Sequence, residues 1–341
     1  MTDFPPQPER PRLKGACCVV TGSNGFVGSH VVDELVRCGA RVRALVRKSS
    51  NLRWLEGTAA EVVYGELRSP ESLPQVLDGA DFVFHVAGVV KARSRETYFQ
   101  VNAGGTRSLL EACCACGASP RVVLVSSLAA GGPSGRGPAV TEDMPPAPIS
   151  FYGESKVEAE KIAAGYFDRL PVAIVRPPVI YGPRETDVFQ FIKAAVRWHF
   201  APIAGKSDTP LSVIHIADVV RGLLDAALSD RAAGSICYIS GPQPVTWESV
   251  ADAIQEVLGR RVRRLCIPMP VVRASALLSE AVSAVRRKPA LFNREKVREI
   301  LADGWVCSTG KARREIGFDP QVDIIAGMRN AIEWYRAHRW L

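Results

Sequence analysis

A glycine-rich turn between a short apolar strand and a helical segment constrains this chain most. Glycines stand at positions 22, 25 and 28, directly after the apolar residues 16–21 and at the start of the pattern 26–37. Glycine adopts the backbone angles of a tight turn and lets the main chain approach a ligand closely. The N–H groups at the start of the helix then face a phosphate. The segment therefore predicts a dinucleotide site, the alternative being a purely structural turn. The residues expected to touch the dinucleotide here are Gly22, Ser23, Asn24, Gly25, Phe26, Val27 and Gly28.

Strand and helix patterns alternate through the first half of the chain, which predicts an α/β fold with a doubly wound parallel sheet. After about residue 180, prolines interrupt the pattern and helices dominate from about 247, which predicts a smaller, mostly helical lobe that binds substrate. Strands are expected at 16–21, 41–46, 61–65, 81–88, 121–126 and 172–176, and helices at 26–37, 95–115 and 151–168. The expected divisions are a disordered tail at 1–12, a Rossmann-type domain at 13–181 plus about 213–240, and the lobe at 182–212 and 241–341.

The composition restricts the class of protein. With 341 residues, 47% of them hydrophobic, the chain can bury a large core. Its net charge of +8 is spread out and aromatic residues are few, which favours a solvated basic surface over a nucleic-acid interface. The N-terminus has no apolar signal segment, so we expect a cytoplasmic protein whose nine cysteines are reduced.

Two other features of the sequence bear on metal binding and on membrane association. Cys113, Cys114 and Cys116 are expected to be buried apolar residues, because a closed zinc site needs four ligands; no metal is expected. No stretch is long enough to span a membrane. Residues 271–285 come nearest, and they predict an amphipathic helix over a substrate cleft or, alternatively, one on a membrane surface.

The end of the second strand indicates which cofactor the chain binds. An acidic residue there would bind the ribose 2′-hydroxyl of NAD, but this chain has Arg47 and Lys48. Two cations suit the 2′-phosphate of NADP, so NADP is favoured and NAD remains the alternative. Arg47 as a solvated loop charge is the structural alternative.

Tyr152 and Lys156 lie four residues apart and share one face of the predicted helix 151–168. An ammonium near the phenol would lower the tyrosine pKa and suit the phenol to proton transfer. Ser126 and Ser127 end a strand at the same sheet edge, where a hydroxyl could hold a substrate oxygen. The alternative is a capping serine with a surface Tyr–Lys pair.

These motifs together resemble the extended short-chain dehydrogenase/reductase family. They are the turn 21–28 and the segments 65–67, 85–88, 101–106, 126–127, 152–156 and 176–183. The resemblance implies that Tyr152 donates or accepts the proton, that Lys156 holds the nicotinamide ribose, and that Ser127 (or else Ser126) orients the substrate oxygen. It also implies cofactor contacts at Glu66, Leu67, Ala87, Gly88, Pro178 and Val179, and a homodimer through the helices 95–115 and 151–168.

Within the family, residues 176–179 (Arg-Pro-Pro-Val) provide no asparagine for a sugar nucleotide. They resemble the branch of 3β-hydroxysteroid dehydrogenases and dihydroflavonol reductases, as do residues 287–293. This implies an oxidoreductase that interconverts a secondary alcohol and a ketone on a bulky apolar small molecule. The alternatives are a nucleotide-sugar epimerase or dehydratase with tightly bound NAD, and a binding protein that senses NADP without turnover.

Some polar residues are expected to be structural. Asp218 should cap a helix with His215 hydrogen-bonded nearby, and a catalytic pair is the alternative. His85 should pack near the cofactor. Asn102 should hold neighbouring backbone through its amide.

Overall fold

The computed structural model describes residues 9–117, 119–286 and 294–341. Among these residues, a central sheet of seven strands is parallel throughout. The strand order reverses between β1 and β4, which leaves a crevice beyond their carboxyl ends, where doubly wound folds bind ligands. Across the sheet the strands are β10 (Ser235–Tyr238), β6 (Val172–Arg176), β5 (Arg121–Val125), β4 (Phe82–His85), β1 (Cys17–Thr21), β2 (Arg41–Val46) and β3 (Glu61–Tyr64).

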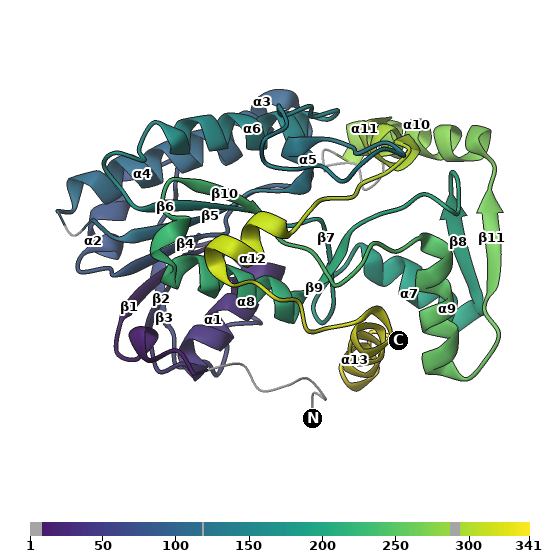
Figure 1. Cartoon of the computed structure of the whole chain (residues 1–341), viewed down its shortest axis with the longest axis horizontal. Helices are drawn as coiled ribbons and strands as arrows, with labels where there is room; N and C mark the ends of the chain where they lie inside the picture. Colours follow the sequence, from purple (N-terminus) through teal and green to yellow (C-terminus); the bar gives the residue numbers. More distant parts are fainter. Residues whose placement is uncertain (1–8, 118, 287–293) are drawn as a thin grey trace.

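Helices cover both faces of this sheet (Figure 1). Successive strand residues point to opposite faces, so Cys18 and Val20 pack against α1 and α8, while Val19 packs against α2, α4 and α6. Each such large side chain stabilises the fold by about 1.5–3 kcal/mol through burial. The helices of these two layers are α1 (Phe26–Arg37) and α8 (Ile216–Leu228), and α2 (Leu73–Leu77), α4 (Gly105–Ala115) and α6 (Phe151–Ala164).

The later part of the chain forms a third hydrophobic core beyond the sheet, around helices α7, α9 and α13. It holds a parallel ladder of β8 and β11, at the right of Figure 1. Its elements are α7 (Val188–Trp198), β8 (Phe200–Ala204), α9 (Trp247–Leu258), β11 (Arg263–Ile267), α10 (Met269–Arg286), α11 (Arg294–Leu301) and α13 (Ile324–Ala337). In the described residues, no helix is long and apolar enough to cross a membrane.

The expected return of residues 213–240 to the main sheet is only partly correct. β10 does pair with β6 at the sheet edge, and α8 covers one face. However, β9 (Val213–His215) pairs with β7 (Val179–Tyr181) in a separate ladder. The apolar pattern of residues 213–215 predicted a strand, but a pattern of burial does not specify the pairing partner.

The predicted disordered tail at 1–12 is wrong for its last residues, whereas residues 1–8 lie outside the described part of the chain. Pro11–Leu13 form a 3₁₀ turn, and Leu13 is fully buried. Arg10 is buried too and pairs with Asp225 of α8 at 2.8 Å. The burial of Leu13 and this ion pair offset the entropy lost on ordering the segment.

The predicted helix 95–115 is broken into three parts. α3 (Arg95–Tyr98) is followed by a π-helical turn, Phe99–Gly104, and then by α4. Such π turns are rare and often lie at functional sites. The π turn of this chain contains Asn102, whose amide meets the loop after β4.

Candidate active site

The glycine turn has the geometry that a pyrophosphate site requires. Gly22 has φ +68°, and a Cβ there would lie 2.8 Å from the Ala87 backbone. A Cβ on Gly28 would lie 2.2 Å from the Gly22 carbonyl oxygen. Neither position accepts a side chain without moving backbone. α1 begins with Gly25 as its N-cap, so the first N–H groups of the helix have no capping side chain over them.

A cavity of about 1020 Å³ runs from this turn, past the ends of the strands, to the C-terminal helices. Its size is at the upper end of ligand pockets. It brings together most of the residues predicted from the sequence: Gly22, Asn24, Gly25, Phe26, Val27, Gly28, Arg47, Glu66, Leu67, Ala87, Gly88, Ser127, Tyr152, Lys156, Pro178 and Val179.

Two residues predicted to touch the cofactor, Ser23 and Lys48, do not line the cavity. Ser23 is buried, and its Oγ donates to the Leu45 carbonyl at 3.0 Å, which ties the turn to β2. Lys48 is exposed on the turn after β2, and the cavity lining there is formed by Arg47 and Ser50. Arg47 therefore provides a cation at this end of the cavity, and Arg68 lines it too.

Tyr152 lies in the first turn of α6, which Ser150 caps by accepting from the Gly153 N–H. Its phenol hydrogen-bonds with Ser127. Burial raises the pKa of Tyr152 to about 12, against the opposing effect of this hydrogen bond. The expectation of a lowered tyrosine pKa is therefore wrong for this structure, because desolvation outweighs the favourable contacts of the phenolate.

Lys156 lies one helical turn further along α6 and is buried. Its Nζ donates to the Val125 carbonyl at 2.8 Å and lies 5.9 Å from the centre of the Tyr152 ring. Burial lowers the pKa of Lys156 to about 8, although the charge of Glu160 opposes the shift. A Cβ on Gly88 would come within 3.3 Å of this Nζ, so the glycine leaves the amine open to the cavity.

Ser126 and Ser127 have different partners. The Ser126 hydroxyl donates to the buried carboxylate of Glu160, which also accepts from Arg176 Nε at 2.8 Å. Ser127 caps the short helix α5 (Leu128–Gly131), accepting from the Ala129 N–H at 3.1 Å, and also reaches Tyr152. Of the two serines, only Ser127 contacts the phenol.

Asn102 holds the backbone beside the site, as expected. Its Oδ1 accepts from the Val89 N–H at 2.8 Å, and its Nδ2 donates to the Val89 carbonyl at 3.1 Å. Nδ2 also donates to Ser155, whose own hydroxyl donates to the Tyr152 carbonyl. Asn102 thus fixes the loop after β4 relative to the helix that carries Tyr152.

The histidines expected to be structural are buried in hydrogen-bond networks. His85 lies between Thr21 Oγ1 at 2.8 Å and Thr106 Oγ1 at 3.1 Å. Burial lowers the pKa of His85 to about 3, so the ring is neutral at physiological pH. This agrees with a packing role near the end of β1.

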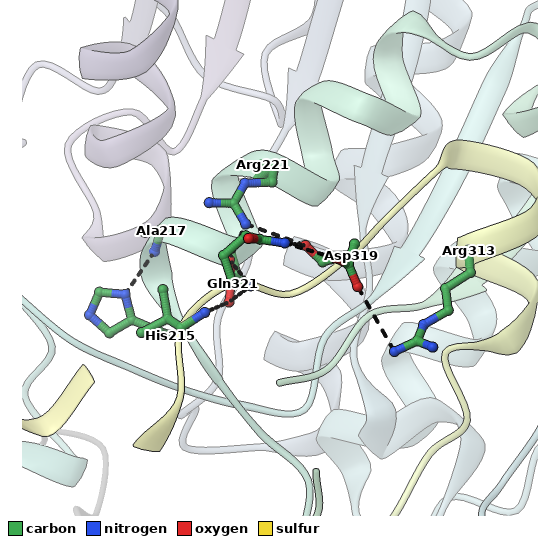
Figure 2. Close-up of polar contacts among 8 residues, drawn as sticks. His215, Ala217, Arg221, Arg313, Asp319 and Gln321 are labelled. Carbon is green, nitrogen blue, oxygen red and sulfur yellow. Dashed lines mark hydrogen bonds and ion pairs between the residues drawn. The ribbon is translucent and has the colours of Figure 1, made fainter. Parts of the chain in front are cut away.

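His215, not Asp218, caps α8, which corrects the sequence expectation. His215 Nδ1 accepts from the Ala217 N–H at 3.2 Å (Figure 2). Asp218 is fully buried in the first turn and accepts from the backbone N–H groups of Gln321 and Val322 and from Arg221. The sequence could not show this, because the two N–H groups come from a segment about a hundred residues away.

Sequence reasoning missed the residues that line the far part of the cavity. They come from α7, α9, α11 and the segment after α11, and include Phe191, Trp247, Glu295, Glu299, Ile300 and Trp305. Glu295 Oε1 accepts from the Phe151 N–H at 2.9 Å, which fixes α11 against the start of α6. α11 is amphipathic, but its helical pattern alone does not indicate which face meets a ligand. The segment 287–293, which carried part of the resemblance, lies outside the described residues.

Comparison with known proteins agrees with this geometry. Residues 18–237 match the model of the NAD dependent epimerase/dehydratase family. The chain is 32% identical over 324 residues to a ceramide reductase of Caulobacter vibrioides, covering 94% of this chain and 95% of the relative. It is 26% identical over 334 residues to a 3β-hydroxysteroid dehydrogenase/Δ5→4-isomerase of Mycobacterium tuberculosis, covering 93% and 90%. The solved structure of MoeE5 with UDP-glucose and NAD superposes with a TM-score of 0.76 at 26% identity, covering 95% and 100%.

Proposed function

The chain belongs to the NAD-dependent epimerase/dehydratase family, and from this premise we propose that it reduces a ketone on a bulky, lipid-like molecule with NADPH. The members of this family and the relatives named above are NAD(P)-dependent enzymes of the short-chain dehydrogenase/reductase type. The ketone, the apolar substrate and the preference for NADPH are our proposal.

One observation carries the proposal: the Ser127–Tyr152 pair opens into a cavity whose lining is mostly apolar. On its far wall, Phe191, Trp247, Leu211, Trp305 and Val188 provide apolar surface beside the charged Glu295 and Glu299. Such a wall binds hydrocarbon by removing it from water. The names of the ceramide reductase and the steroid dehydrogenase point to the same class of substrate.

The residues around the glycine turn fit a dinucleotide, because Gly22 and Gly28 permit the tight turn and the first N–H groups of α1 have no capping side chain over them. The first N–H groups of α1 would hold the pyrophosphate, and Lys156 would hold the nicotinamide ribose. When bound, the cofactor supplies the hydride that reduces the ketone carbon.

Tyr152 gives its phenolic proton to the ketone oxygen. The phenol is protonated at neutral pH and so has a proton to give, and its burial, which raises the pKa to about 12, makes it a weaker acid until the phenolate is stabilised. The Ser127 hydroxyl donates to the same oxygen and orients it. The Lys156 amine lies deep beside the ring and stabilises the phenolate that remains after transfer.

The preference for NADPH is supported by Arg47, the first residue after β2 and part of the cavity lining. A guanidinium there pairs with a 2′-phosphate, for which NAD has only a hydroxyl. We expect Arg47→Asp to lower kcat/KM for NADPH by at least about tenfold and to leave that for NADH unchanged or improved.

The proposal is tested by incubating the purified chain with NADPH and a set of detergent-dispersed ketones: a 3-ketosphingolipid, a 3-ketosteroid and a short methyl ketone. Cofactor oxidation and the mass of the product are followed. We expect reduction of at least one large ketone and slower reduction of the short one. Cofactor binding without reduction of any ketone contradicts the proposal and favours a sensor.

A nucleotide-sugar epimerase is the second candidate, favoured by the UDP-glucose and NAD bound to MoeE5. It predicts NAD that stays bound through purification and turnover of UDP-glucose without added cofactor. Pro178 and Val179, where a sugar-nucleotide enzyme would need an amide, argue against it. Mass spectrometry of the denatured protein for retained NAD distinguishes the two candidates.

A further inference from the structure

Helix α10 exposes an apolar stripe on its outer face. Val271 is 54% exposed, Leu278 66% and Val282 42%, and Ala274 is exposed between them. Their spacing of three and four residues places them on one side of the helix. A contiguous apolar face of this kind marks a surface that meets a partner or a membrane, whereas single exposed apolar residues carry no such meaning.

The opposite side of α10 is anchored to the protein next to the proposed substrate site. Val272 and Ala276 are buried against Val297 of α11. α11 in turn contributes Glu299 and Ile300 to the cavity lining. Its Glu295 accepts a hydrogen bond from the backbone at the start of α6, the helix that carries Tyr152. α10 therefore packs against α11 (Figure 1), the helix that contributes to the cavity wall, and carries the exposed stripe on its other side.

The charge around the stripe indicates what covers it. Helix α10 itself carries two arginines, Arg273 and Arg286, and one glutamate. That glutamate, Glu280, pairs with Arg294 of α11 at 2.9 Å, whereas Arg273 is exposed. In a symmetric interface between two copies, this net positive helix would face itself, and like charges would repel. An anionic bilayer offers hydrocarbon to the stripe and phosphate to the arginines.

We infer that α10 docks on the surface of an anionic phospholipid bilayer, with Val271, Leu278 and Val282 among the acyl chains. The inference rests on the proposed function, because a membrane is where a lipid-like ketone is found. α11 then separates the bilayer from the cavity, which places the proposed substrate site one helix away from the membrane surface.

The test measures sedimentation of the full chain with vesicles of phosphatidylcholine alone, and with vesicles of phosphatidylcholine and phosphatidylglycerol in equal parts. We expect the anionic vesicles to bind at least about tenfold more chain, with binding that weakens as salt is added. The double variant L278E/V282E should lose at least about tenfold of this binding. The matched control is Y64E/W198E, which places the same two charges on exposed hydrophobic residues outside α10, on β3 and α7. NADPH binding by fluorescence reports that each variant is folded.

Equal vesicle binding by L278E/V282E and the unmodified chain overturns the inference, and so does no binding by the unmodified chain. A dimer that L278E/V282E converts to a monomer, without vesicle binding, shows that a second copy covers the stripe. The two proposals can fail separately. If the chain reduces dispersed ketolipids but does not bind vesicles, only the membrane docking is contradicted. If it binds vesicles but reduces no ketone, only the proposed function is contradicted.

Discussion

At the scale of single residues, the site depends on which way neighbouring side chains point. Ser126 and Ser127 are adjacent at the end of a strand, so they face opposite directions. One reaches the buried Glu160–Arg176 pair and the other reaches Tyr152. The sequence placed both serines at the right edge of the sheet, but the choice between them depended on partners contributed by α6.

This difference predicts opposite outcomes for two alanine variants. Ser127→Ala should lower kcat by about 10²-fold, because the substrate oxygen loses its orienting hydroxyl. Ser126→Ala should keep kcat near that of the unmodified chain and lower the free energy of unfolding by about 1 kcal/mol, since Glu160 loses one donor. Steady-state kinetics and urea unfolding of both variants check this. A Ser126 variant with the larger loss of kcat would reverse the assignment.

At the scale of secondary-structure elements, Asp218 connects α8 to the segment before α13. It accepts from two backbone N–H groups and from Arg221, all within a fully buried position. Arg221 also donates to the Asp319 carbonyl of the same segment (Figure 2). The Asp218 carboxylate thus joins α8, which covers one face of the sheet, to the segment that precedes α13.

Asp218→Ala should lower the free energy of unfolding by about 3 kcal/mol, because two buried N–H groups lose their acceptor and the buried Arg221 guanidinium loses its counter-charge. The matched control is Asp230→Ala, which removes an exposed ion pair with Arg121 and should change stability by less than about 1 kcal/mol. Urea unfolding measures both variants. Equal stability of the two would show that the connection contributes little.

The elements of the first half were largely predictable, because each carries its own pattern. The turn at 22–28, the strand before it and the helix with Tyr152 are short-range features with clear spacing. The π turn that carries Asn102 was not, since no local signal separates it from the helices around it. The partner of β9 and the face of α11 were not predictable either, because both are set by segments distant in sequence.

At the scale of the whole molecule, neutral histidines are built into the interior. Burial lowers the pKa of His30 to about 4 and those of His85 and His215 to about 3. The folded state therefore binds fewer protons than the unfolded state below about pH 6.5. The free energy of unfolding must fall as the pH falls through this range.

Between pH 7 and pH 5.5 we expect a loss of about 1 kcal/mol for each of these histidines. Buried carboxyls such as Glu185, whose pKa is raised by burial, act in the opposite direction, over a pH range that extends upward from the ordinary carboxyl pKa. Urea unfolding at several pH values in this window measures how the free energy of unfolding changes with pH. A constant free energy from pH 7 to 5.5 would contradict the burial of neutral rings.

The account as a whole depends on a proton delivered by Tyr152 to a ketone held beside a bound nicotinamide. The most direct measurement compares Tyr152→Phe with the unmodified chain, for both kcat on a reducible ketolipid and the Kd of NADPH. We predict a loss of kcat of about 10³-fold with a Kd changed by less than about twofold, because the ring remains and only the proton donor is lost. Turnover at the original rate in Tyr152→Phe would contradict the account.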